Sequence, residues 1–142
     1  AGSRLDDDYG QRVANLAKQS PRAEWVGALS RRATKQLVAQ SHLCIVPSSA
    51  EGGANVVSEA IAAGTPILCT SIPGNLGLLG NDWPGAFPVA DATALAALIE
   101  RAATEKSFLD DLCLRTRKMQ SMVDPSTERQ AWHALLHDLS LS

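Results

Sequence analysis

The segment from residue 43 to residue 69 constrains the fold of this chain more than any other part. Two short apolar runs, residues 43–46 and 67–69, predict two strands. Between them lie a loop of small residues and then a helix. We expect that helix to begin near Asn55 and to end at Gly64, because glycine suits the C′ position after a helix. The segment therefore predicts a strand–loop–helix–strand unit, and alternating strands and helices predict a parallel sheet with right-handed crossovers.

The loop before that helix has the composition of an anion site that also accepts hydroxyl groups. The first N–H groups of a helix lack partners, and Gly52, Gly53 and Ala54 leave room for a ligand to approach them. A phosphate is the usual occupant of such a place. Glu51 and Glu59 bracket the loop, and a carboxylate accepts hydrogen bonds from paired sugar hydroxyls. Together these groups indicate a nucleotide-sugar site.

This segment resembles the retaining GT-B glycosyltransferases, chiefly glycosyltransferase family 4. Glu51 and Glu59 match the family's E-x7-E pattern, and the surrounding Pro-Ser-x-x-Glu-Gly…Glu-Ala-x-Ala-x-Gly-x-Pro frame matches too. Residues 25–27 look like the family's strand before the base loop, and residues 91–97 look like its late Asp-x-x-x-Leu-Ala helix start. The resemblance implies an α/β fold, a three-layer Rossmann-like parallel sheet of about four strands with helices on both faces. That architecture is the C-terminal, donor-binding half of a GT-B enzyme.

The resemblance also implies roles for individual residues. Glu51 would lie by the donor sugar hydroxyls as the expected catalytic residue, and Glu59 would hold the ribose hydroxyls. Leu29 and Arg31, in the predicted 27–32 loop, would lie near the base. No metal and no cofactor are expected, because the nucleotide sugar is a substrate. The donor sugar and diphosphate would be bound by Ser48, Gly52, Gly53, Ala54, Asn55 and Val56.

Departures from the family pattern suggest one bacterial branch. The loop reads Gly-Gly-Ala-Asn where the family usually has an aromatic residue after the first glycine, and Gly77 falls where the family has a glutamate. With Pro-Gly-Asn-x-Gly-Leu-Leu-Gly at residues 73–80, the chain looks similar to the selenosugar synthases of selenoneine biosynthesis. That similarity implies a UDP-N-acetylhexosamine donor such as UDP-N-acetylglucosamine, and selenophosphate as acceptor. Composition and spacing indicate neither.

We expect residues 1–142 to form one nucleotide-sugar-binding domain that is itself a fragment. A helix predicted over residues 9–19 opens the chain, so the strand that should feed it is missing. In the resembled family that strand and its loop carry basic residues that clamp the diphosphate, and an N-terminal domain binds the acceptor. The full-length protein would be a glycosyltransferase of the hexosyltransferase type, whereas the fragment alone would be inactive.

Composition argues against several other kinds of partner. The net charge is −2 without a basic stripe, so nucleic acid is not indicated. No apolar run approaches membrane-spanning length, and a cytoplasmic location is expected. The three cysteines, Cys44, Cys69 and Cys113, lie in apolar or helical contexts and predict buried thiols. His133 and His137 are spaced as zinc ligands on a helix, but no third ligand is evident, which favours a surface pair.

The rest of the chain predicts further elements. Residues 24–26 and 86–89 predict strands, and Trp25 is better explained as a core residue than as a base-stacking platform. Residues 72–82 predict a loop that contains only a short 76–79 turn, and Trp83 after it is a candidate exposed interface residue. His42 is expected to begin the strand before the central loop.

Helix ends and the last helix are predicted from local signals. Ser30, Asp91 or Thr93, and Asp124 before Pro125 are candidate N-caps. The last helix is expected to run to about residue 139. Either it buries its apolar side chains or it exposes them for a partner to cover. Those side chains are Trp132, Leu135, Leu136 and Leu139.

Two other functions stay open at this point. A non-catalytic nucleotide- or phosphate-binding α/β regulatory module explains the strand–loop–helix unit but not the pair Glu51 and Glu59. A GT-B nucleotide-sugar epimerase or phosphorylase explains both.

Overall fold

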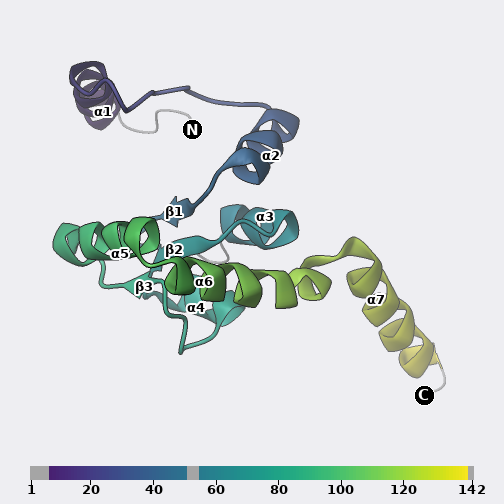
Figure 1. The fold of residues 1–142 in the computed structure, drawn as a ribbon. Coiled ribbons are helices and arrows are strands. Elements are labelled where there is room, and N and C mark those ends of the chain that lie inside the picture. Colours follow the sequence, from purple (N-terminus) through teal and green to yellow (C-terminus); the bar gives the residue numbers. More distant parts are fainter. Residues whose placement is uncertain (1–6, 51–54, 141–142) are drawn as a thin grey trace. The chain divides into compact units, whose positions relative to one another are not determined.

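The computed structural model describes residues 7–50 and 55–140 of the chain (Figure 1). The chain divides into two compact units, Ala1–Leu37 and Val38–Ser142. No helix in the described part is long and apolar enough to cross a membrane. The elements are α1 (Asp7–Gln19), α2 (Arg31–Gln40), β1 (Cys44–Val46), α3 (Asn55–Ala63), β2 (Ile67–Thr70), α4 (Pro73–Leu79), β3 (Ala86–Phe87), α5 (Ala92–Thr104), α6 (Lys106–Lys118), the 3-10 helix η1 (Gln120–Val123) and α7 (Pro125–Ser140).

The sheet of the described residues contains three parallel strands in the order β1–β2–β3. Cys44 pairs with Ile67 across the first two strands, and Thr70 pairs with Phe87 across the second two. All residues of the central strand β2 are buried, which explains why its first three residues are an apolar run. The predicted α/β fold with a parallel sheet is confirmed, as are both strands of the 43–69 unit.

Helix α3 follows β1 and packs its apolar face into the core. Val57, Ala60 and Ile61 are its buried residues, and their i, i+3, i+4 spacing places them on one face of the helix. The same core contains residues from β2, α4, β3, α5 and α6. Its buried members include Val46, Ile67, Leu68, Cys69, Leu79, Trp83, Phe87, Ala102, Phe108 and Leu112.

The carboxyl end of α3 closes as the glycine at residue 64 predicts. Gly64 has a φ of 72°, and its N–H donates to the Ile61 oxygen at 3.0 Å. The N–H of Thr65 donates to the Ala60 oxygen at 3.0 Å, which completes the two bonds of a Schellman motif. The hydroxyl of Thr65 then donates to the buried oxygen of Val38 at 2.9 Å, which ties the turn to another residue of the same unit.

Two of the predicted strands differ in the structure. Residues 24–26 form no strand, because a three-residue strand needs a hydrogen-bonded neighbour and this segment pairs with no strand of the described sheet. The sheet therefore has three strands where about four were expected. The last strand is shorter than the predicted 86–89, since β3 ends at Phe87. His42 lies before β1, which begins at Cys44.

The prediction of a loop over residues 72–82 is wrong, because α4 occupies residues 73–79. Pro73 takes a first-turn position, where its missing N–H costs nothing. Gly74 and Gly77 lower the intrinsic helix propensity, but packing of Leu76, Leu78 and Leu79 against the core outweighs that weak local preference.

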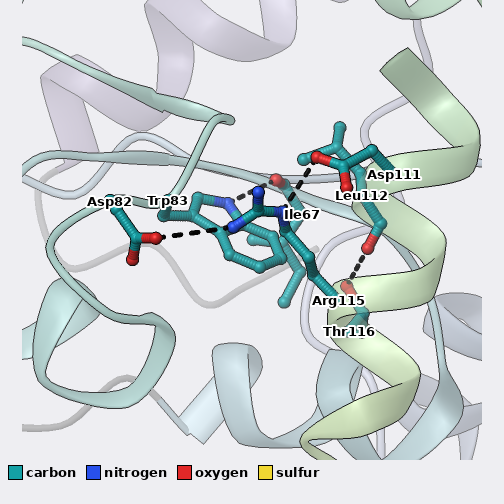
Figure 2. Close-up of polar contacts among 7 residues, drawn as sticks. All are labelled: Ile67, Asp82, Trp83, Asp111, Leu112, Arg115 and Thr116. Carbon is teal, nitrogen blue, oxygen red and sulfur yellow. Dashed lines mark hydrogen bonds and ion pairs between the residues drawn. The ribbon is translucent and has the colours of Figure 1, made fainter. Parts of the chain in front are cut away.

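Trp83 is a core residue, so its prediction as an exposed interface residue is wrong. Only 4% of its surface is exposed, and its Nε1 donates to the Ile67 oxygen at 3.0 Å. Figure 2 shows this bond together with Arg115, which approaches Asp82 at 3.6 Å and Asp111 at 2.8 Å. The turn after α4 is thus held against both β2 and α6.

The predicted helix caps at Ser30, Asp91 and Asp124 are confirmed. The Ser30 hydroxyl accepts from the Ala33 N–H at 3.3 Å, and the Asp91 carboxylate accepts from the Ala94 N–H at 2.8 Å. Asp124 accepts from the N–H of Ser126 at 2.7 Å, directly before α7. Each cap supplies a partner for a helix N–H group that has none within its own helix.

Helix α7 exposes its apolar residues, contrary to the expectation of burial. Trp132, Leu135 and Leu136 are 57%, 49% and 58% exposed. The alternative expectation, that this helix presents apolar surface, is the one that the structure bears out. The side chain of Leu139 lies outside the described part.

Candidate functional site

The predicted site residues fall into three groups. Glu51, Gly52, Gly53 and Ala54 lie outside the described residues, so their roles stay predictions. Leu29 and Arg31 belong to the Ala1–Leu37 unit. The remaining four, Ser48, Asn55, Val56 and Glu59, belong to the Val38–Ser142 unit.

Ser48 and Asn55 flank the predicted donor loop at the carboxyl end of β1. Ser48 is half-buried and follows the last strand residue by two positions, and Asn55 is the exposed first residue of α3. Val56 is half-buried and packs against the core. Ligands of open α/β sheets bind at the carboxyl ends of the strands, and α3 begins at that end. The helix therefore opens where the sequence predicted an anion site.

Glu59 lies one turn into α3 and is half-buried. Burial raises the pKa of the Cys44 thiol on β1, and the nearby Glu59 carboxylate raises that pKa further. A carboxylate in this place is one turn from the opening of the helix, and its oxygens can accept hydrogen bonds from hydroxyl groups.

Two buried polar residues that the sequence analysis missed connect the ends of β1 and β2. The Thr70 hydroxyl donates to the Ser48 oxygen at 2.6 Å. The Asn75 Nδ2 donates to the Thr70 oxygen at 3.0 Å and to the Thr70 Oγ1 at 3.1 Å. Thr70 and Asn75 are both fully buried. The signal in the sequence was a polar residue directly after the apolar run 67–69, followed by Asn75 in the Pro-Gly-Asn sequence.

The Ala1–Leu37 unit contains Leu29 and Arg31 on either side of the Ser30 cap. Leu29 is half-buried, and Arg31 is the exposed first residue of α2. Their role near the base stays a prediction.

The same unit has a hollow of about 440 Å³ that none of the predicted site residues lines. Trp25 contributes to its wall and is half-buried. The other lining residues are Gln11, Ala14, Ala17, Lys18, Ala23 and Glu24.

Within residues 7–50 and 55–140 the structure contains no cluster of three or more His, Cys, Asp or Glu side chains that could hold a metal ion. His133 and His137 are exposed on α7. Cys44, Cys69 and Cys113 are free thiols; Cys69 is fully buried and the other two are half-buried.

The parallel sheet, with α3 opening at the carboxyl end of β1, defines a Rossmann-like α/β domain. The family model described as "Glycosyl transferases group 1" matches residues 1–119, which is most of the chain. This chain therefore belongs to the group 1 glycosyltransferase family and carries a glycosyltransferase domain of the GT-B type. The match includes every predicted site residue and ends before η1 and α7. Comparison with curated proteins gives no match.

Proposed function

We propose that this chain is the donor-binding domain of a family 4 glycosyltransferase that moves a hexose from a nucleotide diphosphate sugar to an acceptor. The observation that carries the proposal is the position of α3, which begins at Asn55 beside the carboxyl end of β1. A helix N-terminus there offers unpartnered N–H groups and a positive dipole end to a diphosphate. Membership of the group 1 family supports sugar transfer as the reaction.

In this proposal each residue of the segment has a distinct role. Glu59 accepts hydrogen bonds from the ribose hydroxyls, and Glu51 orients the donor sugar. Ser48, Gly52–Ala54, Asn55 and Val56 surround the sugar and the diphosphate. The helix N-terminus stabilises the negative charge that develops on the leaving diphosphate. The proposal requires no metal and no cofactor.

We further propose UDP-N-acetylglucosamine as the donor and selenophosphate as the acceptor, in the cytoplasm. Support comes from the resemblance of residues 51–60 and 73–80 to the selenosugar synthase branch. The acceptor would be held by a separate N-terminal domain, and Leu29 and Arg31 would lie near the uracil.

Titration with UDP and UDP-N-acetylglucosamine by calorimetry tests the donor site. Glu59→Gln should weaken binding by about ten- to a hundredfold, because it removes a charge-assisted hydrogen bond. Glu100→Gln is the matched control, since Glu100 is exposed on α5. Equal affinity of the two variants would show that Glu59 does not hold the ribose, and absence of saturable binding by the wild type would overturn the donor site.

A parallel titration with ADP- and GDP-linked sugars tests the choice of base. Tighter binding of the UDP compound is the expected result. Conversion of the nucleotide sugar in the absence of any acceptor would instead indicate an epimerase or phosphorylase.

A further inference from the structure

A buried amide oxygen next to the candidate site has no hydrogen-bond partner among the residues that the structure describes. It is the Oδ1 of Asn75, in the first turn of α4. The Nδ2 of the same amide donates to both oxygens of Thr70, at 3.0 Å and 3.1 Å. Exchanging the amide oxygen and nitrogen would set Oδ1 against the Thr70 carbonyl, which is another acceptor. The unpaired oxygen therefore follows from the arrangement itself.

The fold does not need the Asn75 amide to satisfy the main chain at the end of β2. The Thr70 oxygen already accepts from the Ile72 N–H at 2.9 Å, so the end of β2 has a partner without Asn75. An unpaired buried acceptor lowers stability, and a side chain of similar shape without polar atoms would avoid that loss. Such groups are uncommon in folded proteins, and each one calls for an explanation.

The explanation lies in the hydroxyl that the amide orients. Because the Asn75 Nδ2 donates to the Thr70 Oγ1, the single hydroxyl proton of Thr70 is directed to the Ser48 oxygen, 2.6 Å away. Ser48 lies between β1 and α3, and Thr70 is the last residue of β2. These two hydrogen bonds form a relay from Asn75 through Thr70 to Ser48. The relay attaches the main chain that follows β1 to the last residue of β2.

We propose that Asn75 and Thr70 are positioning residues that hold the Ser48 carbonyl and thereby set the affinity of the donor site. The inference rests on the proposed function, because it assigns the relay to the segment that would bind the donor. Neither side chain needs to touch the ligand. Their effect reaches it through the main chain at Ser48, which leads to the N-terminus of α3.

Two valine substitutions, one at the last residue of β2 and one in the turn that closes α3, test the proposal. Thr70→Val removes the hydroxyl that holds Ser48, whereas Thr65→Val removes a buried hydroxyl that donates to the Val38 oxygen at 2.9 Å. Thr70→Val loses two side-chain hydrogen bonds and Thr65→Val loses one, so both variants should unfold at lower urea concentration than the wild type. Only Thr70→Val should also weaken UDP-N-acetylglucosamine binding, by roughly three- to tenfold.

Two further variants separate positioning from stability. Thr70→Ser keeps the hydroxyl and should restore most of the lost affinity. Asn75→Leu should leave the urea midpoint unchanged or higher, because it removes the unpaired oxygen, and should still weaken donor binding. Asn75→Ala, which adds no volume, serves where leucine overpacks the site, and it too should weaken donor binding.

The possible results are distinct. Equal losses of affinity in Thr70→Val and Thr65→Val, or unchanged affinity in Thr70→Val and in both Asn75 variants, would overturn the relay while leaving the proposed function intact. A wild-type protein that binds no nucleotide sugar would overturn the proposed function and this inference with it. Weaker binding in Thr70→Val and Asn75→Leu, with recovery in Thr70→Ser, supports the relay.

Discussion

Trp83 donates its indole N–H to the main-chain oxygen of Ile67, and 3.0 Å separates the nitrogen from that oxygen. The bond joins the turn after α4 to the first residue of β2. Gly85 occupies the same small space, because a Cβ built on it would come within 2.5 Å of the Ile67 oxygen and 2.9 Å of the Trp83 Nε1. The indole, the strand oxygen and the glycine therefore depend on one another.

Gly85→Ala is expected to destabilise the protein by about 1–3 kcal/mol, because the new methyl group must displace main chain and not a flexible side chain. Gly77→Ala is the matched control: a Cβ there meets nothing within 4 Å, and alanine favours the helix that surrounds it. Urea unfolding of both variants gives the comparison. Similar midpoints for the two would contradict the close approach at Gly85.

Trp83→Phe keeps an aromatic ring in the core but removes the donor to the Ile67 oxygen. We expect a loss of about 1 kcal/mol in the free energy of unfolding, which is typical of one intramolecular hydrogen bond. The control is Trp132→Phe on the exposed face of α7, which should change the unfolding midpoint little. Equal effects from these two substitutions would mean that the indole N–H contributes nothing.

Gly64→Ala should cost about 1 kcal/mol or more, because the residue has a φ of 72° and an L side chain is strained there. Gly64→Asn should cost less, since asparagine tolerates the left-handed region better than alanine does. Thermal or urea unfolding distinguishes the two variants. If Gly64→Ala and Gly64→Asn unfold at the same midpoint, the left-handed conformation of residue 64 does not limit the stability of the protein.

Alkaline pH should weaken the fold through Cys69. Burial raises the pKa of this thiol from 9.0 to about 11, so the folded protein keeps its proton where the unfolded chain releases it. The resulting contribution to stability is complete below pH 9.0 and is lost as the pH rises towards about 11. Urea unfolding across this range should show a shallower decline in Cys69→Ala than in the wild type. Parallel pH profiles would argue against a buried neutral thiol.

The parts of the fold that the sequence predicted are those that depend on residues close together in the chain. The apolar runs that became β1 and β2, the glycine at residue 64 and the cap at Asp91 are all local signals. The parallel sheet followed from their order along the chain. Glu51 and Glu59 also form a local pattern, and that pattern indicated the candidate site. Their roles stay predictions.

The parts that could not be predicted depend on distant partners. The indole of Trp83 is buried and donates to the oxygen of Ile67, which is 16 positions away. The residues next to Trp83 in the sequence do not predict that contact. Gly74 and Gly77 have low helix propensity, so the sequence predicted a loop where α4 forms. The stability of that helix comes from packing. Thr70 and Ser48 are 22 positions apart, so their hydrogen bond becomes visible only once β1 and β2 lie side by side.

Several hydrogen bonds hold the carboxyl end of α3. There Gly64 and Thr65 close the helix, and Gln120 of η1 donates to the Ala62 oxygen at 3.1 Å. A helix of nine residues is roughly 12 Å long, so a tilt of about 5° pivoting at that end moves Asn55 by about 1 Å. Val57, in the first turn of α3, is fully buried, so core packing opposes such a tilt at the end of the helix that faces the proposed donor. The bonds at residues 62–65 and the burial of Val57 together hold the helix at both of its ends.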